Sequence, residues 1–153
     1  MAYDLDLLTG IARELDTAGI GVWKPETAYA DDDVAITLDA LPESPGTAIA
    51  LSAYTLTDDP VEGANVTGLQ VRSRAAARDD SRPGRELADA IFLFLHGRWA
   101  WTLPTGLHVV QIGRRSHVSG GQDQNGRWSI IQNFHADLHV PQMHQHQIPE
   151  ETP

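Results

Sequence analysis

The stretch GRWSIIQNFHADLHV, residues 126–140, decides the fold because apolar and polar side chains alternate along it. Alternation with a period of two places successive side chains on opposite faces of an extended strand. The residues that share the apolar face are Trp128, Ile130, Phe134, Ala136 and Leu138. Gln132 is the exception on that face. The preceding GLHVVQIGRRS, residues 106–116, is predicted to be a second strand, and Asn125-Gly126 between them is typical of a hairpin turn.

Two helices are predicted from apolar residues spaced three and four positions apart. The first carries its apolar stripe at Leu5, Leu8, Ile11, Ala12 and Leu15. The second covers RELADAIFLFLHG, residues 85–97, with Ser81 as its cap and Gly97 at its end. Its predicted buried stripe is Leu87, Ala90, Ile91, Phe94 and Leu95.

Three further strands are expected at residues 34–38, 47–56 and 69–74. In the last of them, Leu69 and Val71 should face inward. Gln70, Arg72 and Arg74 should face outward. The order of elements predicts an α+β fold, with two helices packed on a mainly antiparallel sheet of about five strands.

Residues 1–140 are expected to form a single α+β domain. Residues 141–153, PQMHQHQIPEETP, contain three prolines and no periodic apolar residues. We therefore expect a flexible C-terminal tail there.

Charge and composition limit the possible functions. The chain has a net charge of -10, and residues 1–62 alone carry a net -11, whereas residues 63–98 carry +2. An acidic chain is a poor general nucleic-acid binder because phosphates repel it. Cysteine is absent, which excludes disulfides and thiolate metal sites. The N-terminal MAYDLDLLTG has no basic region and no long apolar run, so neither a signal peptide nor membrane association is expected.

The histidines near the C-terminus raise the question of a metal site, because histidine is the commonest metal ligand. His135, Asp137 and His139 fall on one face of the last predicted strand. His135 and His139 are then ~13.5 Å apart, too far for one ion to bind both. A site at His135 and Asp137 would need His108 or His117 from the neighbouring strand. A polar sheet face is the favoured interpretation, and a small metal-dependent enzyme stays an alternative.

No catalytic or cofactor-binding signature is present: the sequence has no HExxH, GxSxG, P-loop or post-strand GxGxxG motif. We therefore expect no enzyme activity, no catalytic residue, no cofactor and no bound metal.

Several residues are instead candidates for a subunit or partner interface. A basic strip is predicted at Arg72, Arg74, Arg78, Arg82 and Arg85. Asp58 and Asp59 are the acidic candidates, although turn formation and solvation also explain them. Trp99 and Trp101 lie in GRWAWTLPTG, and one of them should point outward if that segment is extended. An exposed tryptophan is a good interface anchor, and packing under the adjacent loop is the alternative. An ordinary solvated surface remains the alternative for the arginines.

Five segments in order resemble a known family: LLTGIARELDTAGIGVWKP, AIALSAYTLTDDP, GLQVRSRA, ELADAIFLFLHG and VVQIGRRS…GQDQNGRWSIIQNFHADLH. Together, over roughly residues 3–140, the chain resembles the tail terminator, or minor capsid, proteins of long-tailed phages that infect actinobacteria. The resemblance implies a tail-terminator-like fold and a structural virion protein. It does not include the histidines.

By this resemblance, copies of the protein form a homo-oligomeric ring, most simply a hexamer, at the head-proximal end of the tail tube. The ring stops tube polymerisation and joins the tail to the head. The implied partners are the major tail tube protein and a head-completion or connector protein, and DNA passes through the ring without sequence-specific binding. The implied location is the virion, at the head–tail junction, after assembly in the bacterial cytoplasm. Alternatives are a head-completion adaptor at the same junction and a plain binding module with an acidic face.

Overall fold

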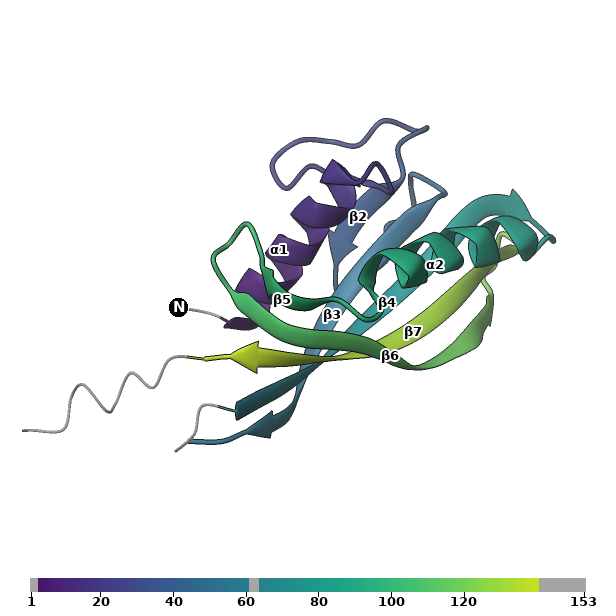
Figure 1. Cartoon of the computed structure of the whole chain (residues 1–153). Helices are drawn as coiled ribbons and strands as arrows, with labels where there is room; N and C mark the ends of the chain where they lie inside the picture. Colours follow the sequence, from purple (N-terminus) through teal and green to yellow (C-terminus); the bar gives the residue numbers. More distant parts are fainter. Residues whose placement is uncertain (1–2, 61–63, 141–153) are drawn as a thin grey trace, which may run out of the picture.

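The structure is a computed structural model, and it describes residues 3–60 and 64–140. Both predicted helices are present: α1 spans Tyr3–Thr17 and α2 spans Arg82–Leu95 (Figure 1). Gly19 adopts a φ of 75° just after α1, and Gly97 one of 84° just after α2. Glycine adopts such values without strain, which explains why both helices end there.

The prediction of a mainly antiparallel sheet of about five strands is wrong, because the sheet has seven strands and mixed pairing. The strands are β1 (Val22–Trp23), β2 (Ala35–Leu38), β3 (Ala48–Asp58), β4 (Ala64–Arg78), β5 (Trp99–Thr102), β6 (His108–Gln122) and β7 (Arg127–His139). Their order across the sheet is β1-β2-β3-β4-β7-β6-β5. The β1–β2 and β2–β3 pairs are parallel, and the other four pairs are antiparallel. The protein is therefore β-rich.

The lengths of the strands explain this difference from the prediction. β1 and β5 are only two and four residues long, too short to show an alternating pattern. β3 and β4, by contrast, are longer than predicted. β3 continues to Asp58 and β4 begins at Ala64, in sequence whose composition favours turns. Pairing with a neighbouring strand holds these polar residues extended, which local sequence does not reveal.

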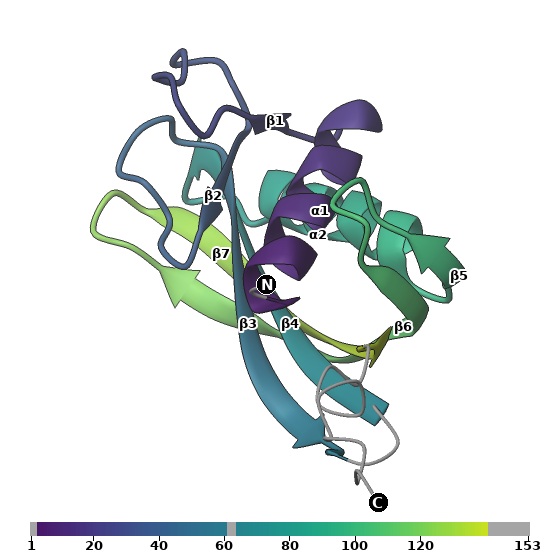
Figure 2. The same cartoon turned by 90° about the vertical axis from the view of Figure 1, so that its left-hand side faces the viewer.

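Both helices lie on the same side of the curled sheet (Figures 1 and 2). α1 packs on β1, β2 and β3, whereas α2 packs on β4, β6 and β7. The core between helices and sheet is closed by fully buried side chains, among them Leu7, Ile11, Leu15, Leu69, Val71, Ile91, Leu95 and Phe134. In the predicted stripe of α2, Ile91 and Leu95 are buried but Ala90 is exposed, and Ala88 is buried in its place.

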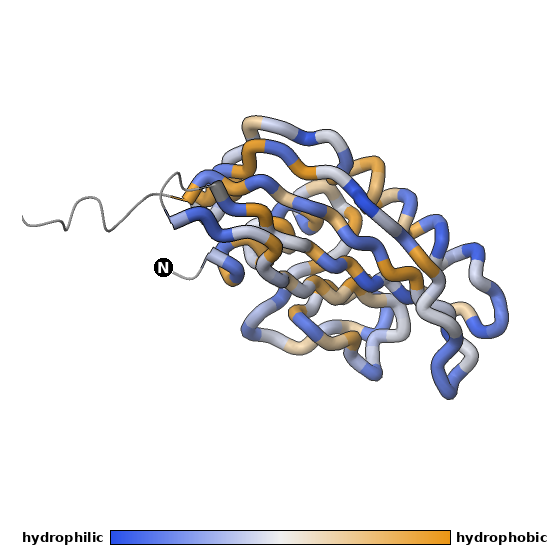
Figure 3. The backbone as a smooth tube through the Cα atoms, turned by 90° about the horizontal axis from the view of Figure 1, so that it is seen from below, coloured by the Kyte–Doolittle hydropathy of each residue, from blue (hydrophilic) through white to orange (hydrophobic). Residues whose placement is uncertain are grey.

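The alternation that predicted β7 is confirmed. Ile130, Phe134, Ala136 and Leu138 are buried on the helix side of the sheet. Gln132 is also fully buried, and its amide donates to the Ala88 carbonyl at 3.0 Å and accepts from Arg114 at 3.0 Å. These bonds satisfy the one polar side chain on that face and tie β7 to α2. Figure 3 shows the alternation of hydrophilic and hydrophobic residues along the strands.

The predicted tail, residues 141–153, lies outside the described residues. No helix among residues 3–60 and 64–140 is long and apolar enough to cross a membrane.

Candidate subunit interface

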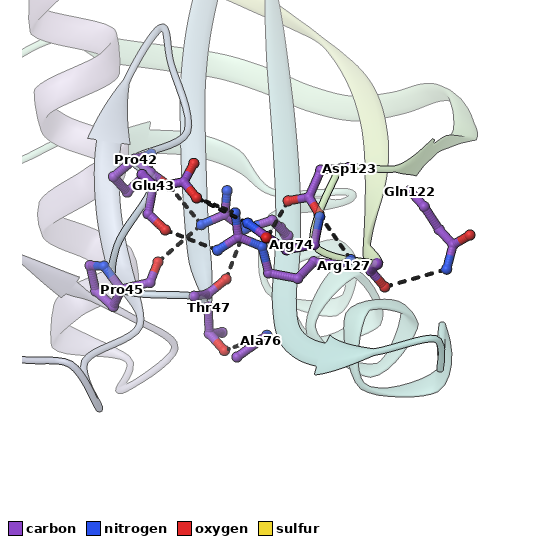
Figure 4. Close-up of polar contacts among 12 residues, drawn as sticks. Pro42, Glu43, Pro45, Thr47, Arg74, Ala76, Gln122, Asp123 and Arg127 are labelled. Atoms are coloured by element: carbon purple, nitrogen blue, oxygen red, sulfur yellow. Dashed lines mark hydrogen bonds and ion pairs between the residues drawn. The ribbon is translucent and has the colours of Figure 1, made fainter.

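Arg74 lies on the outer face of β4 as predicted, but its guanidinium is buried there against the loop before β3 instead of being exposed. Nε donates to the Gly46 carbonyl at 2.8 Å, and Nη2 donates to the carbonyls of Pro42 at 2.7 Å and Pro45 at 3.0 Å. The residue is only 5% exposed. At this position the loop covers the sheet face that alternation assigns to solvent, so Arg74 binds the loop in place of water (Figure 4).

Arg127 on β7 lies beside Arg74 and binds the same loop (Figure 4). It donates to the Glu43 carbonyl at 2.9 Å and to the Asp123 carboxylate at 2.7 Å. Burial opposes ionisation of Asp123, but hydrogen bonds from Arg127 and Asn125 outweigh it, and the pKa of this carboxyl is lowered. Burial, together with the charge of Arg127, lowers the pKa of Arg74, which stays charged at any ordinary pH. Arg74, Arg127, Glu43 and Asp123 together form what we call the arginine knot.

The five arginines do not form one exposed surface, because Arg74 is buried and the other four are divided between β4 and α2. Arg72 and Arg78 are exposed on β4, whereas Arg82 and Arg85 are exposed on the first turns of α2. Arg82 forms a bidentate pair with Asp80 at 3.0 Å, and Arg85 contacts Ser81 Oγ at 3.4 Å. A single basic strip is therefore not present, although the four exposed arginines remain candidates for contacts with another chain.

The acidic candidates lie far from these arginines. Asp58 is exposed at the end of β3 and accepts a hydrogen bond from Asn65, its partner on β4. Asp59 follows it directly. Arg72 pairs with Ala50, eight residues earlier on β3, which is ~27 Å along the strand. The acidic residues and Arg72 thus lie toward opposite ends of the β3–β4 pair.

The two tryptophans behave as predicted, because one points outward. Trp99 is 76% exposed. Trp101 packs under Arg98, whose guanidinium lies 4.4 Å from its ring, and it meets Phe94 edge-on at 6.0 Å. The residue between the tryptophans, Ala100, has a φ of 49°, an unfavourable value for alanine that breaks the alternation of β5. Trp99 is therefore the better anchor for a partner.

The strand register now fixes where the histidines lie. His135 is opposite Gly113, and Asp137 is opposite Gln111, so neither meets His108 or His117. His108 lies opposite His139, and His117 lies opposite Gln132. Within the part of the chain that the structure describes, no group of three histidine or acidic side chains is placed to hold a metal ion.

A band of neutral polar side chains crosses the sheet face that carries no helix, and sequence reasoning missed it. Asn133 on β7 is its centre: it accepts from Tyr54 at 3.3 Å and Gln70 at 3.4 Å, and donates to Ser116 at 3.2 Å. Tyr54 lies across the sheet because Gly68 has no side chain, since a Cβ there would stand 2.1 Å from the ring. Gly68 within the strand pattern was the available signal for this close approach.

A groove of about 520 Å³ opens beside α1, lined among others by Leu5, Trp23, Tyr29 and Leu38. Its one charged lining group, Lys24, pairs with Asp33 at 2.8 Å, and this pairing lowers the pKa of Asp33. The groove therefore resembles an apolar contact surface more than a catalytic cleft.

No protein-family model matches the chain, and no curated protein sequence matches it. The fold is similar to that of a solved chain described as "Virion of native gene transfer agent (GTA) particle". The TM-score is 0.56 with 18% sequence identity, over 68% of this chain and 78% of the other. At this identity the similarity establishes a shared fold.

Proposed function

We propose that the protein is a structural component of a phage-like virion, and specifically a tail terminator that assembles into a ring on the tail tube. The observation that carries the proposal is the fold shared with a chain of a gene transfer agent particle. The sequence resemblance to tail terminators and the structural similarity both point to a structural virion protein, and the tail-terminator role rests on the sequence resemblance.

The surface of the molecule supports an assembly role. Exposed arginines and the Asp58–Asp59 pair lie toward opposite ends of β3 and β4, so two copies in head-to-tail arrangement can bring unlike charges together. Head-to-tail contacts between identical copies generate a ring when the rotation closes. Trp99 adds an exposed aromatic side chain of the kind that anchors protein interfaces.

In this role the ring, most simply a hexamer, covers the last ring of tail tube protein. A tube grows by stacking identical rings, so growth ends when a different surface covers the growing end. The opposite face of the terminator then meets a head-completion or connector protein. DNA passes through without being held, consistent with the acidic character of the chain.

The test is deletion of the gene in the phage or gene transfer agent that encodes it. We expect unattached tails with over-long or ragged tubes, measured by negative-stain microscopy, next to heads without tails. Free tails of uniform normal length would contradict the proposal and would indicate a head-side adaptor instead.

A further inference from the structure

Half of β6 has an unpaired edge. β5 pairs with β6 only from His108 to Gln111, and backbone bonds from Gly97 and Arg98 extend this contact to Ile112. His96 Nδ1 then accepts from the Arg114 amide at 2.9 Å. Beyond this point, in the described part of the chain, β7 is the one strand that pairs with residues 115–122. Residues 115–120 are all exposed, and Figure 1 shows β6 continuing at the border of the sheet.

β3 has an unpaired edge of similar length at the opposite border. β2 pairs with β3 only from Ala48 to Leu51. Within the described residues, β4 is the one strand that pairs with the remainder, residues 52–58. Residues 54–58 are all exposed, and the end of the β3–β4 pair projects beyond β2 (Figure 1).

An unpaired edge presents backbone donors and acceptors to any other strand. Neither lysine nor proline, which often block strand edges, occurs at 52–58 or 115–122. Each edge does contain irregularities in register, between Thr55 and Thr57 on β3 and at two places on β6, and a pairing strand must accommodate them. The two edges carry opposite charges, with Arg115 at the start of the β6 edge and Asp58 at the end of the β3 edge. They also run in opposite directions, since β3, β4, β7 and β6 are successively antiparallel.

We propose that the β3 edge of one copy, residues 52–58, pairs antiparallel with the β6 edge of the next copy, residues 115–122. This inference rests on the proposed ring and identifies the contact that builds it. The sheet of one subunit then continues into its neighbour through backbone hydrogen bonds. In this pairing Arg115 lies within a residue or so of the Asp58–Asp59 pair.

The geometry of the two edges allows such a chain of copies to close. In the sheet register, Ser52 lies level with Ser116 through Gln70 and Asn133. The free β3 edge extends from this level in one direction, and the free β6 edge extends in the other. Overlapping them therefore requires an offset of about four to six residues, or ~13–20 Å along the strand.

That offset accumulates over four strands, which span ~19 Å across the sheet. An offset of ~13–20 Å along the strands over ~19 Å across them corresponds to strands tilted by about 35–45° to the ring axis. Closed sheets are found in this range of tilt. The pairing joins two different edges, β3 of one copy and β6 of the next. The contact is therefore head-to-tail.

The experiment uses the absence of cysteine from the chain. Thr55→Cys places a thiol on the β3 edge, and His117→Cys places one on the β6 edge; both positions are exposed. Full-length protein is treated with a short bismaleimide reagent and analysed by denaturing electrophoresis. We expect no cross-link from either single variant alone, dimers from their equimolar mixture, and a ladder of oligomers from the double variant.

Charge provides the second measurement. Arg115→Asp should reduce cross-linking of the double-cysteine protein by at least tenfold, and adding Asp58→Arg should restore most of it. Arg13→Asp is the matched control, because Arg13 is exposed on α1 and belongs to neither edge, and it should leave cross-linking unchanged.

The outcomes separate this contact from the proposed function. Rings seen by negative stain without cross-links would overturn the edge pairing and leave the terminator function standing. Cross-linked ladders combined with tails of normal length in the gene deletion would support the edge pairing and contradict the terminator function. Dimers from Thr55→Cys alone, or no cross-links from the double variant, would overturn the edge pairing.

Discussion

Replacing Arg74 with methionine should destabilise the protein strongly, although Arg74 stands in a strand at a position that alternation assigns to solvent. Methionine keeps an unbranched chain of similar volume but removes the guanidinium. Three hydrogen bonds to the carbonyls of Pro42, Pro45 and Gly46 are lost. Hydrogen bonds from a charged donor contribute ~1.5–3 kcal/mol each, and losses in one cluster are not additive. We therefore expect a loss of ~2–5 kcal/mol in the free energy of unfolding.

For a domain of this size, 1 kcal/mol corresponds to ~2–4 °C in Tm, so the expected decrease is ~5–15 °C. Thermal unfolding followed by circular dichroism measures it. Arg72→Met is the matched control, since Arg72 is exposed on the same strand two residues earlier, and its effect should stay within ~0.5 kcal/mol. Equal Tm values for the two variants would refute the reasoning that Arg74 binds the loop before β3.

Three further predictions can be checked by the same unfolding measurement. Trp101→Ala should lower the free energy of unfolding by ~2–3 kcal/mol because the ring packs under Arg98, whereas Trp99→Ala should change it by no more than ~0.5 kcal/mol. Similar losses in the two variants would contradict the assignment of Trp99 as the outward residue. Gly68→Ala should cost ~1–3 kcal/mol through its clash with Tyr54, and adding Tyr54→Ala should relieve that clash; additive losses would argue against the close approach. The pKa of Asp123 is lowered in the folded protein, so this carboxylate contributes stability above the unfolded pKa of ~3.9, and that contribution is lost as pH falls through the folded pKa. Tm should therefore decrease on acidification below pH ~4. The decrease should be smaller in Asp123→Asn.

The sequence predicts the helices and strands that are long enough to show several periods of apolar side chains and that bury those side chains in the core. β7 is the clearest example, because Ile130, Phe134, Ala136 and Leu138 face the core as the alternation indicates. α1 and α2 were found for the same reason, and glycine ends both of them. β2 was predicted as a strand, but its parallel pairing was missed because no local pattern specifies strand direction. β1 was missed because its two residues are too few to show a period.

The candidate interface was less predictable, because exposure depends on what other segments cover. Arg74 follows the alternation that places Arg72 outside, yet a loop remote in sequence buries it. The histidine question depended on the register between β6 and β7, which no local pattern specifies. Outward orientation of one tryptophan was predictable, whereas the choice of Trp99 over Trp101 depends on Arg98 and Phe94.

The arginine knot has a consequence for the cooperativity of unfolding. It connects the loop before β3 to β4 and, through Arg127, to β7 and the turn that contains Asp123. Opening the loop alone would remove all three carbonyl acceptors of Arg74 and the Glu43 contact of Arg127, so the loop should unfold together with the central strands as one unit. The Ala76 amide, which donates to Thr47 Oγ1 at 3.0 Å at this junction, should then exchange its hydrogen nearly as slowly as amides of the core, although Ala76 itself is exposed.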